Sequence, residues 1–292
     1  MDVSIIIVNY NGKNITENCL NSIFSLKEKV EKEVIVVDNG SNDGSVEYLK
    51  ERFPQVFFIE NKKNIGFAKG NNLGIKKSRG KYVVLLNNDT EVLNKAFERA
   101  YYFMEKNKDV GICGFKLLNP DGSIQYSCRD FPSFETALFN RTSLFTRIFP
   151  NNPFSQKYLK THFSHDKVIE VDWVSGAAMM IRKSTLDEIG LLDEDYFMYS
   201  EDVDICYRCW QIGKKVVYYP ESKVIHYIGT TTKYNPRLRI PVLWHRHYSM
   251  YLFYKKHYSR DYFLLDFITI FIIFLRFVFL ALLVLTGSKK EV

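Results

Sequence analysis

Over the first ninety residues, apolar and polar positions follow two alternating patterns. Four short runs are apolar at almost every position and rich in β-branched residues, which is typical of buried strands; they are Val3–Val8, Glu33–Val37, Val56–Ile59 and Tyr82–Leu86. The segments between them carry apolar residues at helical spacing, which predicts helices over Asn14–Leu26, Ser45–Phe53 and Gly66–Lys77. Because strands that are apolar on both faces need helices on both faces, the pattern predicts an α/β fold with a mostly parallel sheet.

The pattern that follows is irregular and then becomes ordered again. Residues 119–167 are aromatic, basic and interrupted by prolines, so we expect loops and short helices that form one wall of a site. The elements predicted after them are an ordered stretch over Val171–Ile181, a helix from Ser184 with Ser184 and Asp187 as an approximate capping box, a helix over Glu201–Ile212, and strands over Lys215–Tyr219 and Val224–Tyr227.

The C-terminal segment is basic and aromatic from Arg237 to Arg260 and strongly apolar over Tyr262–Thr286. The apolar stretch is long enough for the roughly 20 residues that cross a hydrocarbon core, but Arg276 in its middle makes insertion costly. Because its polar residues fall on one arc of a helix, we expect it to lie in the membrane interface or to pack on a partner helix. A buried core helix or an oligomer contact is the alternative.

Composition narrows the class of protein. The 292 residues are 46% hydrophobic and 25% charged, enough for a full core. The net charge of +7 suits nucleic acid, an anionic membrane or a phosphorylated substrate, but no nucleic-acid-binding motif is present, so we expect no nucleic-acid partner. The five cysteines are scattered and no secretory signal is evident, which indicates a reducing cytosol. Cys206 and Cys209 are interpreted as buried faces of a helix, since no second pair of ligands stands at zinc spacing.

Polar residues cluster where three of the predicted strands end, the edge at which parallel sheets bind ligands. The three clusters are Asn9-Tyr10-Asn11-Gly12, Asp38-Asn39-Gly40-Ser41 and Asn87-Asn88-Asp89-Thr90. Asp38 is placed to accept a hydrogen bond from a nucleobase or a ribose, and the amides after it suit a phosphate. Asp89, together with two diphosphate oxygens, would form a hard site for Mg²⁺ or Mn²⁺. Ordinary turns are the alternative reading of both clusters.

Acidic residues gather later in a chain that is otherwise basic, and six of them lie within twelve residues: Asp193, Glu194, Asp195, Glu201, Asp202 and Asp204. Like charges this close raise one another's pKa unless a cation or a proton-transfer role justifies them. A solvated loop with favourable charges at a helix start is the alternative. The aromatic residues between the acids favour a packed site.

These residues together resemble glycosyltransferase family 2, whose members have the GT-A fold, and within it the rhamnosyltransferase-like members. The resemblance runs from Val3 to about Gly229 and includes the three strand-end clusters, Asn64-Ile65-Gly66-Phe67-Ala68-Lys69-Gly70-Asn71-Asn72, Val174-Ser175-Gly176-Ala177, Gly190-Leu191-Leu192-Asp193-Glu194, Ser200-Glu201-Asp202-Val203-Asp204 and His226. It implies a GT-A type, Rossmann-like sheet with helices on both faces. We therefore expect a catalytic domain over residues 1–235, with a nucleotide-sugar-binding half (1–118) and an acceptor-binding half (119–235). The basic, aromatic and apolar composition of residues 236–292 predicts C-terminal membrane-associated helices after this domain.

The resemblance further assigns roles to residues. Asp202 would be the general base of an inverting displacement, and Asp89 would bind Mg²⁺ or Mn²⁺ with His226, the diphosphate and water, since the first acid of the family's DXD motif is Asn87 here. The expected contacts to a UDP- or dTDP-sugar donor are Asn9, Tyr10, Asp38, Asn39, Ser41, Gly66, Asn71, Asn87 and Asn88. The expected contacts to a glycan or lipid-linked acceptor are Trp173, Gly176, Asp193, Glu194 and Glu201, with Trp173 equally readable as a core aromatic.

The expected activity is therefore transfer of a sugar, with rhamnose among the candidates, in cell-surface polysaccharide synthesis on the cytoplasmic face of the cell membrane. Two other functions remain alternative interpretations of the sequence. A nucleotidyltransferase would also join a parallel sheet to metal-binding acids, but the first strand lacks a glycine- and basic-rich triphosphate loop. A non-catalytic, membrane-bound sugar-binding scaffold would not need the Glu201-Asp202 pair, which is intact.

Overall fold

The computed structural model describes residues 1–132, 160, 164–227, 239–259 and 263–286. Its first part alternates strands and helices: β1 (Val3–Asn9), α1 (Lys13–Phe24), β2 (Lys32–Asp38), α2 (Ser45–Arg52), β3 (Phe57–Glu60), α3 (Phe67–Lys77) and β4 (Tyr82–Asn87). The strands lie in the order β3-β2-β1-β4 and are all parallel. This confirms the predicted strands and helices of the first ninety residues to within about two residues at each end.

The second part extends the same sheet with strands of both directions. Its elements are β5 (Thr90–Val92), α4 (Ala96–Lys106), β6 (Val110–Leu118), β7 (Ile124–Gln125), β8 (Cys128–Arg129), β9 (Ile169–Glu170), β10 (Trp173–Val174), β11 (Ala178–Arg182), α8 (Lys183–Ile189), α9 (Glu201–Gln211) and β12 (Lys215–His226). The sheet continues as β4-β11-β6-β12-β5. Strand β11 is antiparallel to both of its neighbours, β6 and β12 are parallel, and β5 is antiparallel to β12. The sheet is therefore mixed on this side.

Three details of the second half differ from the prediction. The two expected late strands are one strand, β12, whose register with β6 shifts between Tyr219 and Lys223. This irregularity includes Pro220, and it interrupts the apolar pattern without ending the strand. The capping box at Ser184 is wrong, because α8 begins at Lys183 and no side chain caps it. The ordered stretch over Val171–Ile181 is two strands, β10 and β11, separated by a turn.

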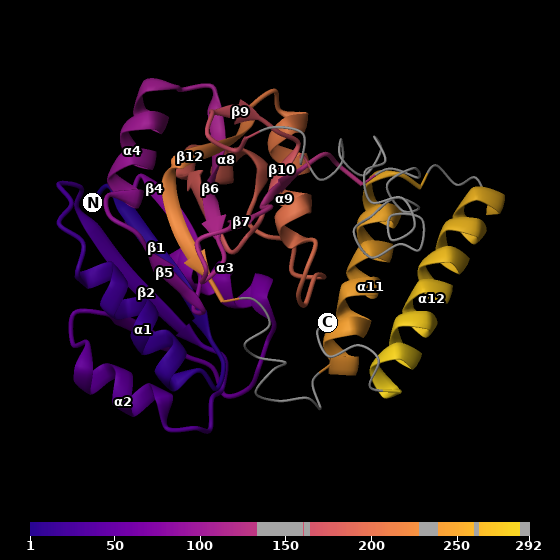
Figure 1. The fold of residues 1–292 in the computed structure, drawn as a ribbon, viewed down its shortest axis with the longest axis horizontal. Helices are drawn as coiled ribbons and strands as arrows, with labels where there is room; N and C mark the ends of the chain where they lie inside the picture. The colour runs from indigo at the N-terminus through magenta and orange to yellow at the C-terminus, as the bar shows by residue number, and fades with distance from the viewer. Residues whose placement is uncertain (133–159, 161–163, 228–238, 260–262, 287–292) are drawn as a thin grey trace.

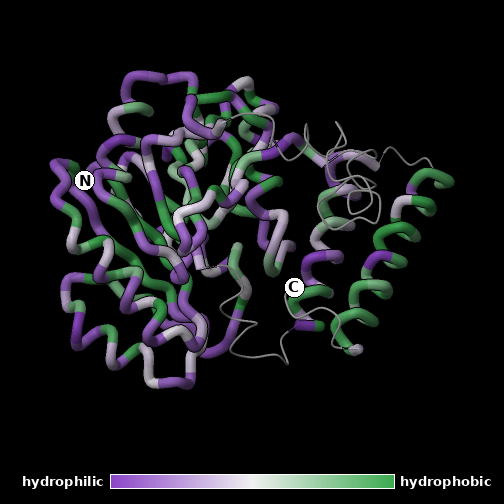
Figure 2. The backbone as a smooth tube through the Cα atoms, in the orientation of Figure 1, coloured by the Kyte–Doolittle hydropathy of each residue, from purple (hydrophilic) through white to green (hydrophobic). Residues whose placement is uncertain are grey.

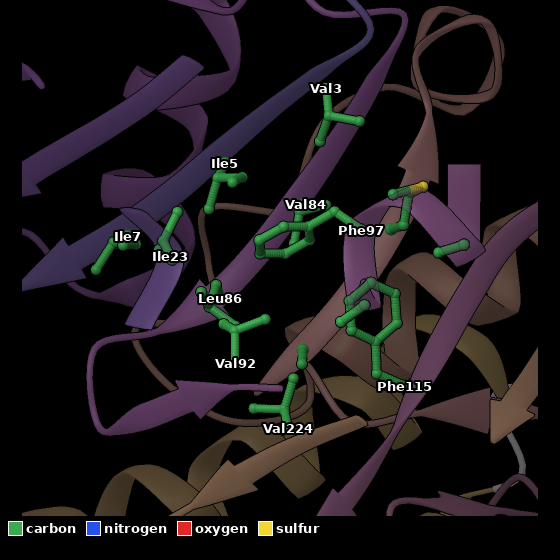
Figure 3. Packing of buried hydrophobic residues seen from close by; sticks show 14 of the residues in the cluster. Val3, Ile5, Ile7, Ile23, Val84, Leu86, Val92, Phe97, Phe115 and Val224 are labelled. Carbon is green, nitrogen blue, oxygen red and sulfur yellow. The ribbon is translucent and has the colours of Figure 1, made fainter. Parts of the chain in front are cut away.

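The core lies on both faces of the sheet, and Figure 3 shows part of the hydrophobic cluster on one of them. On β1, Ile5 and Ile7 belong to one hydrophobic cluster, with Phe97 of α4 and Phe115 of β6, whereas Ile6 belongs to the other. All of these side chains are buried. The second cluster also contains Cys206 and Cys209 of α9, which confirms that these thiols lie on buried faces of a helix. The strands are apolar throughout because each face of the sheet is covered, as the sequence pattern predicts.

Two helices complete the described chain, α11 (Arg239–His257) and α12 (Phe263–Leu285), with α11 lying between α12 and the sheet domain (Figure 1). Helix α11 packs against the sheet domain, because Phe253 belongs to the second hydrophobic cluster and the hydroxyl of Ser249 donates to the carbonyl of Met198 at 2.8 Å. Helix α12 is apolar along most of its length (Figure 2). Only 6% of its apolar window is buried, with a mean hydropathy of 3.0, so it is not a core helix of this chain, and its length and composition would allow it to cross a membrane.

Candidate active site

The parallel register of β1, β2 and β4 brings their polar ends together. Asn9 is the register partner of Asp38, and Val8 that of Asn87. The carboxylate of Asp38 accepts four hydrogen bonds, from the amides of Gly40 (3.0 Å) and Ser41 (2.8 Å), the hydroxyl of Ser41 (2.6 Å) and the side-chain amide of Asn9 (2.8 Å). Asp38 is only 2% exposed. In this structure, Asp38 therefore holds the turn after β2 in shape.

The other predicted donor residues extend this network to differing degrees. The side-chain oxygen of Asn9 accepts from Thr16 at 2.8 Å and from Asn88 at 3.3 Å, so Asn9 links two strand ends to α1. Asn39 donates to the carbonyl of Gly66 at 3.0 Å. Asn71 bonds within its own helix and Tyr10 lies at the surface, 39% exposed. The structure thus joins Asn9, Asp38, Ser41 and Asn88 into one group and places Asn39 and Gly66 beside each other.

Gly66 shows why a glycine is needed at the start of α3. Its φ is +92°, and a β-carbon there would lie 2.6 Å from the carbonyl oxygen of Phe197. The amide of the next residue, Phe67, donates to the same carbonyl at 2.7 Å. The loop before α9 is therefore held against the donor half by a backbone contact that any side chain at this position would displace.

Asp89 and His226 meet where β5 pairs with the end of β12. The carboxylate of Asp89 lies 3.3 Å from Nε2 of His226, and the side-chain nitrogen of Asn87 lies 3.3 Å from the same atom. On the other side of the ring, Nδ1 lies 2.7 Å from Oε1 of Gln125 in β7. Gln125 was not predicted as a site residue, because it lies in the segment without a clear period.

The orientation of Gln125 determines which nitrogen of His226 faces Asp89. The amide nitrogen of Gln125 donates to Asn119 at 3.0 Å and to the backbone carbonyl of His226 at 3.1 Å, so its oxygen faces the ring and accepts from Nδ1. Nε2 is then the ring nitrogen that faces the carboxylate of Asp89 and the side-chain amide of Asn87, and a cation between Nε2 and that carboxylate would be bound by both. Within the described residues, no group of three or more His, Cys, Asp or Glu side chains could hold a metal ion, so Asp89 and His226 are a two-ligand set that a diphosphate would have to complete.

The acids of α9 are held differently from Asp38. Asp202 accepts a hydrogen bond from the amide of Gly176 at 3.0 Å and one from the amide of Val203 at 2.9 Å. A β-carbon on Gly176 would lie 3.3 Å from that of Asp202, so the turn between β10 and β11 packs closely on the helix start. Burial raises the pKa of Asp202, and these two amides and the charge of Arg129 oppose the rise.

Glu201 is only 5% exposed, and its Oε2 atom is buried without a hydrogen-bond partner among the described residues. Burial raises the pKa of Glu201 well above 4.5, and the neighbouring charge of Asp202 adds to the rise. Two amides donate to Asp202, whereas Oε2 of Glu201 has no donor among the described residues. Glu201 therefore retains its proton more readily, and Asp202 is the acid that ionises first. The expected mutual repulsion is present, but burial is the larger cause.

Side chains from α11 and α9 pair with three of the other four acids of the cluster. Asp204, 1% exposed, pairs with Nη2 of Arg208 at 2.7 Å and with Nε2 of His257 at 2.7 Å. Lys256 pairs with Asp193 and with Asp195. Although burial acts to raise the pKa of Asp193, Lys256 and the amide of Asp195 lower it. The cluster is therefore packed, and three of its acids pair with side chains 53 to 63 residues further along the chain.

The residues predicted to contact an acceptor are only partly brought together. Gly176 holds Asp202 and Glu201 precedes it, whereas Asp193 pairs with Lys256 and Glu194 accepts from Asn72 at 3.1 Å. Trp173 is 8% exposed and lies in the second hydrophobic cluster, with its indole nitrogen donating to the carbonyl of Asp130 at 2.8 Å. The structure thus gives Trp173 the core position that was the alternative reading of this residue.

Comparison with known proteins places this chain in a family. A rhamnosyltransferase of Mycobacterium tuberculosis, N-acetylglucosaminyl-diphospho-decaprenol L-rhamnosyltransferase, is 27% identical over 237 residues, 77% of this chain and 75% of the relative. A low-salt glycan biosynthesis hexosyltransferase of Haloferax volcanii is 31% identical over 71% of this chain and 61% of its own length.

Solved structures show the same fold. The match to GalNAc-T7, determined with UDP, GalNAc and Mn²⁺, has a TM-score of 0.59 at 19% identity and covers 78% of this chain and 44% of that one. A mannosyltransferase of Pyrobaculum calidifontis with GDP-Man and Mn²⁺ has a TM-score of 0.58 at 18% identity, covering 87% of this chain and 63% of that one. The fold is the GT-A fold. The family model "Glycosyl transferase family 2" matches residues 4–163, more than half of the 292 residues, and the chain therefore belongs to glycosyl transferase family 2.

Proposed function

We propose that the protein transfers a hexosyl residue from a nucleoside-diphosphate sugar to an acceptor hydroxyl with inversion, and that Asp202 is the general base. The observation that carries this proposal is the placement of Asp202, whose two oxygens accept from the amides of Gly176 and Val203. These contacts orient the carboxylate while burial raises its pKa, which brings a base closer to the pH at which it works. Family membership favours this activity over nucleotidyl transfer.

The donor would bind across the carboxyl ends of β1, β2 and β4. Asp89 and His226 would hold Mg²⁺ or Mn²⁺, and the ion would neutralise the charge that develops on the diphosphate leaving group. Gln125 accepts from Nδ1 of His226, which leaves Nε2, on the side of Asp89, as the ring nitrogen that can bind the ion. The turn that Asp38 organises would receive the base or ribose of a UDP- or dTDP-sugar, and the name of the mycobacterial relative makes dTDP-rhamnose the first donor to test.

The acceptor would be a glycan carried on a membrane lipid, in the synthesis of cell-surface polysaccharide. Helix α12 supports this proposal, since it exposes an apolar surface and is joined to the catalytic part by α11. The mycobacterial relative is named for a diphospho-decaprenol acceptor. A location on the cytoplasmic face would bring a soluble nucleotide sugar and a lipid-linked acceptor to one site.

The decisive experiment is to follow release of nucleoside diphosphate from a panel of UDP- and dTDP-sugars, with Mn²⁺ or Mg²⁺ and a lipid-diphosphate-linked sugar acceptor. We expect one donor to be turned over and to raise the Tm in the presence of the ion. The product should have the anomeric configuration opposite to that of the donor. A Tm increase without any diphosphate release would instead support the non-catalytic scaffold.

Membrane association is tested by truncation. A chain that ends after Arg260 keeps α11 and lacks α12, and we expect it to leave the membrane fraction in high salt. A truncated protein that stays with membranes would show that α12 is not the anchor, and the lipid-linked acceptor would lose its main structural support.

A further inference from the structure

Arg129 is a half-buried cation close to the catalytic helix. It lies in β8, opposite Trp173 of β10, and its guanidinium is 5.2 Å from the centre of the Trp173 indole ring. Its Nε atom is buried and makes no hydrogen bond within the described part of the chain. Among the same residues, no carboxylate lies within ion-pair distance of it. Arg129 was not among the residues predicted from the sequence.

The acids around Arg129 have other partners. Asp130, the next residue, forms an ion pair with Lys160, and Asp172 accepts from the amide of Phe131 at 2.6 Å. Asp202 accepts from the amides of Gly176 and Val203. A guanidinium that is partly removed from water without a matching anion is destabilising, and a bound anion would offset that cost.

The strand pair places Arg129 on the acceptor side of the site. The residue after β10, Ser175, donates to the carbonyl of Ser127, and the next amide, that of Gly176, holds Asp202. The charge of Arg129 is also close enough to Asp202 to lower the pKa of that carboxyl. Arg129 is also close to the predicted metal site. It lies four residues after Gln125, which orients His226, so the two residues are at most about 14 Å apart along the chain.

We propose that Arg129 binds the phosphate group that links the acceptor sugar to its lipid, and that it thereby places the acceptor hydroxyl beside Asp202. This inference rests on the proposed function and names the acceptor class that the site selects, a sugar phosphate or diphosphate of a lipid alcohol. A guanidinium held close to an indole ring can offer its two terminal nitrogens for a bidentate contact to phosphate oxygens. The donor diphosphate has its own predicted site, at Asp89 and His226.

The first test measures binding without divalent cation, so that the metal-dependent donor site does not contribute. Binding of geranyl diphosphate in EDTA should be about 10–100-fold weaker for Arg129→Gln than for the wild type, with partial recovery in Arg129→Lys. The matched control is Arg79→Gln, which removes an exposed arginine paired with Glu33 and should leave binding unchanged. Equal affinities of wild type and Arg129→Gln would overturn the proposal.

A competition arm identifies the source of the phosphate. Addition of UDP with Mn²⁺ should not displace geranyl diphosphate, because the donor binds elsewhere. Displacement would assign Arg129 to the donor diphosphate and overturn the acceptor assignment. Both binding experiments are independent of turnover. Their outcome therefore does not depend on whether the wild type releases nucleoside diphosphate, which is the test of the proposed function.

Steady-state kinetics separate a binding role from a structural one. With an acceptor sugar linked to a short lipid through a diphosphate, Arg129→Gln should raise the acceptor KM about 10–100-fold. With the same sugar on a neutral alkyl chain, the KM should be equal in the two proteins. A similar loss with both acceptors would show that Arg129 acts on the fold or on Asp202 and not on the phosphate.

Discussion

Asp38, at the end of β2, and Glu201, at the start of α9, are both carboxylates with almost no exposed surface, but their surroundings differ. Asp38 accepts four hydrogen bonds, whereas Oε2 of Glu201 has no partner among the described residues. Asp202, next to Glu201, is intermediate and accepts two. The difference indicates that a fully bonded acid stabilises a turn, while an acid with few donors keeps a raised pKa and can exchange a proton.

The source of the donors explains this contrast. Three of the four hydrogen bonds to Asp38 come from the two residues Gly40 and Ser41, and the fourth comes from the adjoining strand. Of the two amides that bond Asp202, one comes from the next residue, Val203, and the other from Gly176, 26 residues away. The surroundings of Asp38 are therefore built largely by local turn geometry, whereas those of Asp202 also depend on tertiary packing.

The largest effect is expected at Asp202. Asp202→Asn keeps the shape of the side chain but cannot accept the acceptor proton, so transfer should fall by about 10²–10⁴-fold while donor binding stays nearly unchanged. Turnover is measured by diphosphate release and donor binding by the shift in Tm. Asp187→Asn, an exposed residue of α8, is the matched control. Normal turnover by Asp202→Asn would exclude Asp202 as the general base and make Glu201 or Asp204 the next candidates.

Asp38→Asn tests whether the four hydrogen bonds to Asp38 stabilise the turn after β2. An amide nitrogen would face donors that now bond the carboxylate, so we expect the free energy of unfolding to fall by about 2–3 kcal/mol, together with loss of donor binding. Denaturant unfolding measures the first effect. Asp43→Asn, in the same turn but partly exposed, should cost less than about 1 kcal/mol. An Asp38→Asn protein as stable as the wild type would mean that the four contacts do not stabilise the turn.

Gln125→Ala tests the metal set through the residue that orients it. Without the acceptor for Nδ1, the ring of His226 loses its fixed orientation, and the affinity for Mn²⁺ in the presence of nucleoside diphosphate should fall by about 10–100-fold.

Asp89→Ala should weaken nucleoside diphosphate binding only when divalent cation is present. Titration calorimetry with and without EDTA distinguishes these outcomes, and Ser123→Ala in the same hairpin is the control. Equal weakening of Asp89→Ala in EDTA would indicate a direct structural role for Asp89.

The smallest effect is expected from Glu201→Gln, read as a pH dependence. The pKa of Glu201 is raised in the folded protein, so the folded state binds the proton more tightly than the unfolded state. Stability is therefore largest below the ordinary pKa near 4.5 and falls as pH rises towards the raised value. The variant should show a smaller fall in Tm as pH rises above 4.5, and a higher Tm than the wild type at the alkaline end. If Tm depends on pH in the same way in the wild type and in Glu201→Gln, the pKa of Glu201 is not raised in the folded protein.

The sequence predicted the elements of the donor half well and parts of the site less well. The strand ends Asn9, Asp38 and Asn87 could be placed on one edge because parallel strands bring their carboxyl ends together. Gln125 and Arg129 were missed because they lie in very short strands, β7 and β8, inside a region without a hydrophobic period. Part of that region, residues 133–159 and 161–163, lies outside the described residues, so its predicted role as a wall of the site stays a prediction.

The sequence by itself determined the alternation of strands and helices, the apolar character of both sheet faces and the apolar C-terminal helix, since each is a local periodicity or composition. Only the tertiary structure decided which acids pair with side chains far along the chain. Asp204 meets His257 and Asp193 meets Lys256 only because α11 packs against α9 and the loop before it, while no cation among the described residues lies within ion-pair distance of Glu201 or Asp202. Charge pairing over 53 or 63 residues depends on how elements pack and not on local pattern, and it is this packing that separates the structural acids from the candidate base.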